Sequence, residues 1–234
     1  MKLIADRLCK TFDGQPVLTD VSFSVESGET LAIVGRSGCG KTTLLRMLAG
    51  FLPPDGGAVW LDGRKADAPD KNRLMVFQSF DQLFPWFTLR QNLQYALKKM
   101  RPELSKSDGR ELAARCLAEM GLGEAGDKFP YQLSGGMKQR GALARAMAVS
   151  PKALLLDEPF SSLDVYSRES ARASLETLKA ATGAALVLVT HDLDEAADTA
   201  THIALMKADK RGVFALMDNT GPDVTKRLRH MLRD

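Results

Sequence analysis

The sequence has few cysteines and no long hydrophobic run. Its three cysteines, Cys9, Cys39 and Cys116, are odd in number and lack the paired spacing of metal ligands, so we expect neither a disulfide framework nor a zinc site. No stretch approaches about 18 uncharged apolar residues, and residues 1–7 include three charged side chains, which argues against a membrane span and a signal peptide. We therefore expect a protein of a reducing, cytoplasmic compartment.

Aromatic residues make up only 6% of the chain, and they do not alternate with basic residues. The net charge is only +3, so we expect no nucleic-acid partner. The locally basic segment 226–230 is typical of a solvated helix end, with a lipid- or nucleic-acid-binding patch as the alternative. A length of 234 residues suits one α/β domain, with or without an inserted lobe.

The first third of the chain predicts strands, a loop and a helix. Short alternating runs in residues 1–35, separated by Asp13-Gly14 and Ser27-Gly28, indicate antiparallel strands and turns. Residues 30–34 form an apolar run that leads into a glycine-rich loop, and residues 41–50 predict a helix that ends at a glycine.

Between residues 84 and 150 the apolar period becomes helical. Leu89, Leu93 and Leu97 recur every four residues, which indicates one face of a helix. Continuous apolar runs at 153–157 and 185–190 are typical of parallel strands that are covered on both faces. The sequence therefore predicts a parallel α/β core that is interrupted by a helical lobe.

Residues 35–42, Gly-Arg-Ser-Gly-Cys-Gly-Lys-Thr, match the phosphate-loop pattern. Its glycines let backbone N–H groups surround an anion at a helix N-terminus. We expect Lys41 to reach the β- and γ-phosphates of a nucleotide and the Thr42 hydroxyl to ligate Mg²⁺. By itself, this loop leaves kinases, GTPases and helicases open.

Polar residues follow both apolar runs of the predicted core. Asp157 ends the run at 153–157, so its carboxylate is expected at the carboxyl edge of the sheet, where it would hold Mg²⁺. Glu158 comes next, and His191 follows the run at 185–190. A lone Asp-Glu pair or histidine is more often structural, but this context favours a functional site.

Residues 133–139, Leu-Ser-Gly-Gly-Met-Lys-Gln, lie between the phosphate loop and the Asp157 strand. Ser134, Gly135 and Gly136 open a helix with basic residues, so its N-terminal amides are expected to form a second anion site. Two anion sites and one γ-phosphate indicate that a second chain takes part.

These motifs, in this order, resemble the ABC ATP-binding cassette from Leu3 to Met217. The resemblance implies a P-loop NTPase (RecA-like) α/β fold, with a parallel-sheet core, an N-terminal antiparallel β subdomain and an inserted α-helical subdomain. Within a single cassette, 1–234, we expect the ATP-binding core at 1–83 and 151–217, the helical and signature subdomain at 84–150, and a short C-terminal tail at 218–234. The implied activity is ATP hydrolysis, with ATP and Mg²⁺ as cofactors.

The resemblance also assigns roles to residues. Glu158 polarises the attacking water, His191 contacts the γ-phosphate, and Phe12 stacks on adenine. The implied catalytic residues are Glu158, His191, Lys41 and Gln78, and the implied metal ligands are Thr42, Gln78 and Asp157. The implied nucleotide-binding residues are Phe12, Gly35, Arg36, Ser37, Gly38, Cys39, Gly40, Lys41, Thr42, Thr43, Ser134, Gly135, Gly136 and Asp164.

The expected partners follow from the same resemblance. The first is a second cassette, in a head-to-tail homodimer that sandwiches two ATP molecules, with the loop 161–164 crossing the interface. The segment Leu83-Phe84-Pro85-Trp86 resembles the branch of importers for nitrate, sulfonates, taurine and related small anions or thiamine precursors. In transporter cassettes this region receives an integral membrane permease. A solute-binding protein and a peripheral position on the cytoplasmic side of the inner membrane complete the hypothesis.

Three other functions stay open at the level of sequence. A soluble ABC ATPase of repair, translation or iron–sulfur assembly would be favoured by a coiled-coil insertion or a second cassette, and the sequence contains neither. An exporter or lipoprotein-releasing ATPase shares the motifs and is poorly separated by sequence. A phosphate-loop kinase would form a phosphorylated product in place of free phosphate.

Overall fold

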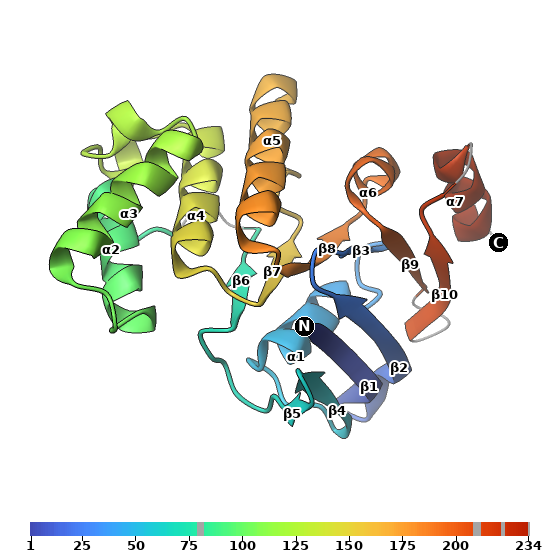
Figure 1. Cartoon of the computed structure of the whole chain (residues 1–234). Helices are drawn as coiled ribbons and strands as arrows, with labels where there is room; N and C mark the ends of the chain where they lie inside the picture. Colours follow the sequence, from blue (N-terminus) through green and yellow to red (C-terminus); the bar gives the residue numbers. More distant parts are fainter. Residues whose placement is uncertain (79–81, 208–211, 221–222, 234) are drawn as a thin grey trace. The chain divides into compact units, whose positions relative to one another are not determined.

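The computed structural model describes residues 1–78, 82–207, 212–220 and 223–233 (Figure 1). The chain forms two compact units. The sheet unit comprises Met1–Met75, Lys152–Glu158 and Ala184–Asp234, and the helical unit comprises Val76–Pro151 and Pro159–Gly183. Each unit is therefore assembled from segments that are distant in the sequence.

An antiparallel sheet begins the sheet unit, with the strand order β2-β1-β4-β5. Its strands are β1 (Lys2–Phe12), β2 (Gln15–Glu26), β4 (Gly56–Leu61) and β5 (Arg64–Lys65). The turn between β1 and β2 uses Asp13 at φ 48° and Gly14 at φ 76°, and positive φ at both positions suits the twist of a hairpin. The predicted N-terminal antiparallel strands are thus confirmed.

Within the described residues, a mostly parallel sheet of six strands forms the core, in the order β10-β9-β3-β8-β7-β6. The parallel strands are β3 (Thr30–Gly35), β7 (Ala153–Asp157), β8 (Ala185–Thr190) and β9 (His202–Lys207). The edge strands are β10 (Gly212–Asp218), antiparallel to β9, and β6 (Arg73–Val76). Every residue of β3, β7 and β8 is buried, as the continuous apolar runs predict.

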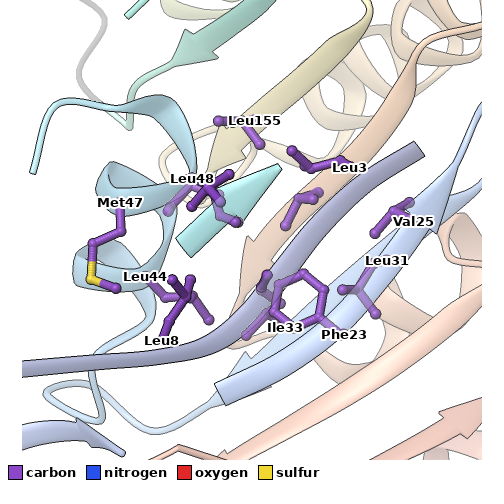
Figure 2. Close-up of a cluster of buried hydrophobic side chains, with 14 of the residues drawn as sticks. Leu3, Leu8, Phe23, Val25, Leu31, Ile33, Leu44, Met47, Leu48 and Leu155 are labelled. Carbon is purple, nitrogen blue, oxygen red and sulfur yellow. The ribbon is translucent and has the colours of Figure 1, made fainter. Parts of the chain in front are cut away.

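Among the described residues, two apolar clusters hold the sheet unit together. The larger one joins Leu44 and Leu48 of α1 (Lys41–Ala49) to Leu31 and Ile33 of β3 and to Leu3 of the antiparallel sheet (Figure 2). The smaller one joins the alternate side chains of β3 to α6 (Leu193–Thr199) and α7 (Val224–Arg233). Burial of each large aliphatic side chain stabilises the fold by about 1.5–3 kcal/mol before entropy is counted. This packing fixes the strand ends at which the candidate site lies.

The helical unit contains α2 (Leu89–Met100), α3 (Lys106–Glu119), α4 (Gly135–Val149) and α5 (Val165–Thr182), with 3₁₀ turns at Gly123–Ala125 and Pro130–Gln132. Leu89, Leu93 and Leu97 are buried, as their period predicts. Helix α4 packs against the other three helices. A Cβ on Gly141 would come 2.7 Å from Leu89 Cδ1, so glycine allows α4 to approach α2 closely.

The helical unit extends beyond the predicted segment 84–150. It includes Pro159–Gly183, and therefore α5, because α5 packs on α4. The prediction from the sequence motifs had instead assigned all of 151–217 to the ATP-binding core. Of the predicted tail 218–234, residues 221, 222 and 234 lie outside the described residues. The division into domains by motif stays a prediction.

Candidate functional site

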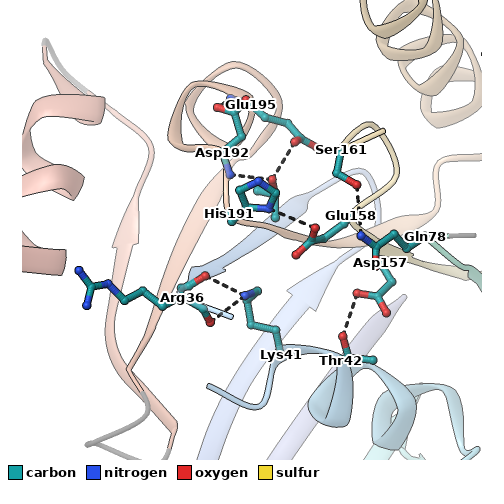
Figure 3. Close-up of polar contacts among 12 residues, drawn as sticks. Arg36, Lys41, Thr42, Gln78, Asp157, Glu158, Ser161, His191, Asp192 and Glu195 are labelled. Carbon is teal, nitrogen blue, oxygen red and sulfur yellow. Dashed lines mark hydrogen bonds and ion pairs between the residues drawn. The ribbon is translucent and has the colours of Figure 1, made fainter. Parts of the chain in front are cut away.

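The phosphate-loop motif connects the end of β3 to the start of α1 (Figure 3). Gly38 at φ 82° and Gly40 at φ 99° have left-handed backbone conformations, which glycine adopts without the cost of a Cβ. Lys41 is buried, and its ammonium donates to the backbone oxygens of Gly35 at 2.7 Å and Arg36 at 3.1 Å. The loop therefore curls around a cation at a helix N-terminus, a geometry that suits a bound anion.

The other residues of the loop differ in exposure. Arg36 and Ser37 are exposed, Thr43 is partly buried, and Cys39 is buried. Burial raises the pKa of the Cys39 thiol, so the side chain is a neutral packing group. Any contact of Cys39 with a nucleotide would come from its backbone.

Thr42 and Asp157 form a polar pair between α1 and the end of β7. The Thr42 hydroxyl donates to Asp157 Oδ1 at 3.1 Å. Asp157 is 6% exposed, and burial raises its pKa above the usual value, although the hydrogen bond from Thr42 opposes the shift. A buried carboxylate beside a hydroxyl fits Mg²⁺, because this ion prefers oxygen ligands and favours the ionised carboxylate.

Glu158 and His191 lie together at the ends of the neighbouring parallel strands β7 and β8 (Figure 3). His191 Nδ1 is 3.1 Å from Glu158 Oε2. Glu158 has φ 44°, which is uncommon for a long side chain and is typical of a constrained functional position. Its N–H donates to the Val189 oxygen at 2.9 Å. This backbone bond stabilises the turn that directs Glu158 toward the end of β8.

A hydrogen-bond network fixes the turn that holds His191. Thr190 Oγ1 donates to Glu195 Oε2 at 2.7 Å and accepts from the Asp192 N–H at 3.0 Å. Asp192 Oδ1 accepts from the Asp194 and Glu195 N–H groups and so caps α6. Sequence reasoning did not include Thr190 and Glu195 among the site residues. The available signal was a hydroxyl at the end of an apolar strand, followed five residues later by an acid.

In the helical unit, the Ser134-Gly135-Gly136 motif forms the N-terminus of α4. Ser134 Oγ accepts from the Met137 N–H at 3.3 Å. A Cβ on Gly136 would come 2.9 Å from Ser167 Oγ, so the absence of a side chain lets α4 approach the first turn of α5.

Asp164 caps α5 next to this contact. Its carboxylate accepts from the Ser167 N–H at 3.0 Å and from the Ser167 hydroxyl at 2.7 Å. These bonds hold the pKa of Asp164 below its usual value. The structure therefore links the predicted anion-binding residues of α4 to Asp164 through Ser167.

Gln78 also belongs to the helical unit. Its Nε2 donates to Ser161 Oγ at 3.4 Å and so joins two loops of that unit (Figure 3). Thr42 and Asp157 belong to the sheet unit, and the role of Gln78 as a third metal ligand stays a prediction.

Phe12 lies at the end of β1 with 44% of its surface exposed. Lys10 Nζ is 5.6 Å from the centroid of its ring. An exposed aromatic face is suited to stacking on a planar base, but the contact of Phe12 with adenine stays a prediction.

Four aromatic residues, Phe84, Trp86, Phe87 and Tyr95, form an aromatic patch on the helical unit. The Phe84 ring centroid is 5.6 Å from that of Trp86 and 5.2 Å from that of Tyr95. Trp86 is 66% exposed, whereas Leu83 is 3% exposed. The expectation that Leu83 faces a partner is therefore corrected: Leu83 is a core residue beside the patch.

Asn92 shapes the loop that presents the patch. Its side-chain oxygen accepts from the Phe84 N–H at 2.8 Å, and its amide donates to the backbone oxygens of Phe84, Phe87 and Thr88. Asn92 is fully buried, so these bonds also satisfy its polar atoms. Sequence reasoning missed this residue, although a polar side chain next to the buried Leu93 is a visible signal.

The described part of the chain has no helix with the length and apolar character that a membrane crossing needs. Over the same residues, no group of three or more His, Cys, Asp and Glu side chains is arranged to hold a metal ion. A Mg²⁺ ion at Thr42 and Asp157 would therefore take most of its ligands from phosphate and water, as this ion commonly does.

The sequence of the chain is similar to those of known import ATPases. Residues 18–161 match the family described as ABC transporter. The chain is 42% identical over 189 residues to the nitrate import ATP-binding protein NrtD of Synechococcus elongatus, and the match covers 81% of this chain and 69% of that protein. It is 43% identical over 206 residues to the taurine import ATP-binding protein TauB of Chromobacterium violaceum, with 87% and 78% covered.

The fold is likewise similar to solved structures. A dimeric ATP-binding cassette in a post-hydrolysis state, bound to ADP and Pi, matches with a TM-score of 0.81 and 30% identity, over 94% of this chain and 99% of that chain. The protein cbiO1 of Clostridium perfringens, part of an ABC transporter complex, matches with a TM-score of 0.83 and 27% identity, over 93% and 88%. These neighbours confirm the expected α/β fold.

The family match spans more than half of the residues, and both relatives are more than 40% identical to this chain over most of its length. The chain therefore belongs to the ABC transporter family, as an ATP-binding subunit whose ATPase activity is coupled to transport.

Proposed function

We propose that this chain is the ATPase subunit of an importer for a small anion of the nitrate, sulfonate or taurine class. The support is the identity above 40% to proteins named for nitrate and taurine import. The chain supplies the ATP-driven motion, and the membrane and solute-binding subunits select the solute, since function lies in particular sites and not in the shared fold.

The contact between Glu158 and His191 is the observation that supports the proposed chemistry best. Glu158 accepts a proton from the attacking water, and His191, with Nδ1 3.1 Å from Glu158 Oε2, keeps the carboxylate in one direction and contacts the γ-phosphate. Lys41 binds the β- and γ-phosphates. Phe12 stacks on the adenine ring.

Magnesium is the proposed cofactor beside ATP. Thr42 and Asp157 are its proposed ligands because their oxygens lie within 3.1 Å of each other and Asp157 is buried. Gln78 is proposed as a third ligand on the resemblance alone. When bound, Mg²⁺ supplies neutralisation of phosphate charge.

A second copy of the chain is proposed to complete each nucleotide site. Ser134, Gly135 and Gly136 at the N-terminus of α4 bind the γ-phosphate held by the other copy, and Asp164 lies in the loop that crosses the interface. The dimeric cassette with a TM-score of 0.81 supports this assembly. ATP binding closes the dimer, and hydrolysis reopens it.

The exposed part of the aromatic patch is the proposed contact with an integral membrane permease. Trp86 supplies this contact together with the adjoining Pro85, which is exposed, and Phe84, which is partly buried, because exposed apolar patches mark sites of protein association. The chain then lies peripherally on the cytoplasmic side of the inner membrane, and a solute-binding protein delivers the anion from the other side.

An affinity purification tests the transport proposal. The Glu158→Gln chain, with ATP and Mg²⁺, is used to capture partners from detergent-solubilised membranes of its own cells, and the partners are identified by mass. We expect a multi-helix permease, and a parallel capture with Glu158→Gln/Trp86→Ala should lose it while retaining the dimer. Recovery of soluble assemblies alone would contradict import and favour a soluble ABC ATPase.

The solute class is tested with the permease so identified, reconstituted in vesicles together with the wild-type chain. Binding protein loaded with nitrate, taurine or an alkyl sulfonate is added, and phosphate release is measured for each. Stimulation by at least one of these anions supports the proposal. Equal rates with all loaded and unloaded binding proteins contradict it.

A further inference from the structure

A cavity of about 340 Å³ lies in the helical unit, between the end of α2 and the start of α3. Leu97, Pro102 and Leu104 contribute to its walls, and most of its lining is apolar. Sites for small organic molecules begin at about 300 Å³, so this cavity has room for a compact ligand. None of the residues assigned to the nucleotide lines it.

All the charged side chains that line the cavity are positive. Its lining includes Lys98, Arg101, Lys106 and Arg110 and no carboxylate. Arg101 Nε pairs with Glu103 Oε1 at 3.2 Å. Among the residues that the structure describes, no hydrogen bond or ion pair engages the side chains of Lys98, Lys106 or Arg110. Three positive side chains therefore face one apolar cavity without a compensating charge.

Helix electrostatics explains Lys98 but not the two cations of α3. Lys98 lies in the last turn of α2, where the helix dipole favours a positive charge. Lys106 is the first residue of α3, where the dipole disfavours one. Lys106 and Arg110 are also four residues apart, so like charges repel on one face of the helix. A bound anion would offset both unfavourable terms.

We propose that this cavity binds a small organic anion with one sulfonate, phosphate or carboxylate group on an apolar body. The apolar body packs against Leu97 and Leu104. Lys98, Lys106 and Arg110, which are exposed where they line the cavity, bind the anionic group through charge-assisted contacts. The proposal is independent of the nucleotide chemistry.

The ligand class is tested by calorimetry with naphthalene-2-sulfonate, in the presence of saturating ADP to occupy the phosphate loop. Inorganic sulfate carries the charge alone, and 2-naphthol at pH 7 carries the apolar body alone. We expect naphthalene-2-sulfonate to bind at least about tenfold more tightly than either. Comparable binding of sulfate or 2-naphthol, or loss of sulfonate binding when ADP is added, would overturn the proposal.

Gly109 offers a way to fill the cavity without disturbing the fold. It lines the cavity, and an added Cβ would meet nothing within 4 Å. Gly109→Leu should weaken sulfonate binding by about tenfold or more, while the melting temperature holds or rises because leucine favours a helix over glycine. Gly109→Ala is the matched control and should keep binding.

The cations are tested separately. Lys106→Gln combined with Arg110→Gln should weaken binding by about tenfold, since two charge-assisted contacts are lost. Arg115→Gln, on the same helix but outside the cavity, should leave it unchanged. Wild-type affinity in both Gly109→Leu and the double variant would overturn the proposal.

Discussion

His191 Nδ1 lies 3.1 Å from Glu158 Oε2, although 33 positions separate the two residues in the chain. The Glu158 side chain is 16% exposed and that of His191 is 59% exposed. The largely buried carboxylate of Glu158 therefore contacts the exposed imidazole of His191, and this contact restricts the orientation of the carboxylate. This arrangement supports the proposal that His191 contacts the γ-phosphate and orients Glu158.

Removal of the Glu158 carboxylate should separate binding from hydrolysis. Glu158→Gln keeps the side-chain size and removes the proton acceptor, so we expect phosphate release to fall by about 10²-fold or more, with ATP affinity retained. With purified protein, phosphate release from ATP measures hydrolysis, and titration with a fluorescent ATP analogue measures affinity. Glu169→Gln, at an exposed position of α5, is the control and should keep the wild-type rate. Wild-type turnover in Glu158→Gln would exclude it as the base.

Lys41→Ala should abolish tight nucleotide binding. The substitution removes the ammonium expected at the phosphates and leaves the Gly35 and Arg36 oxygens without their donor. Lys65→Ala removes an exposed lysine that pairs with Asp67 at 3.1 Å and should bind nucleotide normally. Equal affinities of the two variants in a nucleotide titration would refute the role of Lys41.

Truncation to alanine should change the stability of the fold little at Trp86 and strongly at Leu83. Trp86→Ala, at 66% exposure, should change the free energy of unfolding by no more than about 0.5 kcal/mol and leave basal ATP hydrolysis intact. Leu83→Ala, at 3% exposure, should lose about 2–5 kcal/mol. Urea unfolding of both variants measures the difference. Unfolding of Trp86→Ala would show that Trp86 belongs to the core.

The ion pair between Lys10 and Asp55 should contribute to stability in a way that depends on pH. Lys10 Nζ lies 2.7 Å from Asp55 Oδ1, and the Thr11 N–H donates to Asp55 Oδ2 at 2.7 Å. The hydrogen bond from Lys10, with that from Thr11, lowers the pKa of Asp55. A lowered carboxyl pKa stabilises the folded state above the unfolded pKa of about 3.9, and this stability is lost as pH falls through the folded pKa.

Asp55→Asn should therefore be less stable than wild type at pH 7, with the difference shrinking as the pH is lowered through 4 and toward 3. Urea unfolding at a series of pH values measures this. Asp67→Asn, at an exposed ion pair near the same sheet, is the control. A difference between Asp55→Asn and wild type that is constant with pH would contradict the linkage.

Parts of the fold were predictable because they depend on local spacing. The continuous apolar runs of β7 and β8 indicated buried parallel strands, and Leu89, Leu93 and Leu97 indicated the buried face of α2. The glycines of the phosphate loop indicated a backbone that folds around an anion, and in the structure Gly38 and Gly40 have positive φ angles. By contrast, nothing in the spacing predicted that α5 packs with α4 in one compact unit, because helix packing joins side chains from separate segments.

The sequence by itself determined the order of motifs: a phosphate loop, a carboxylate pair after a strand, and a second helix N-terminus that is predicted to bind an anion. Only the tertiary structure decided that Glu158 contacts His191, that Leu83 is buried while Trp86 is exposed, and that the cations of α2 and α3 line one cavity. The physical reason is that a motif needs only neighbouring residues, whereas exposure and contact depend on which elements pack together across long sequence separations.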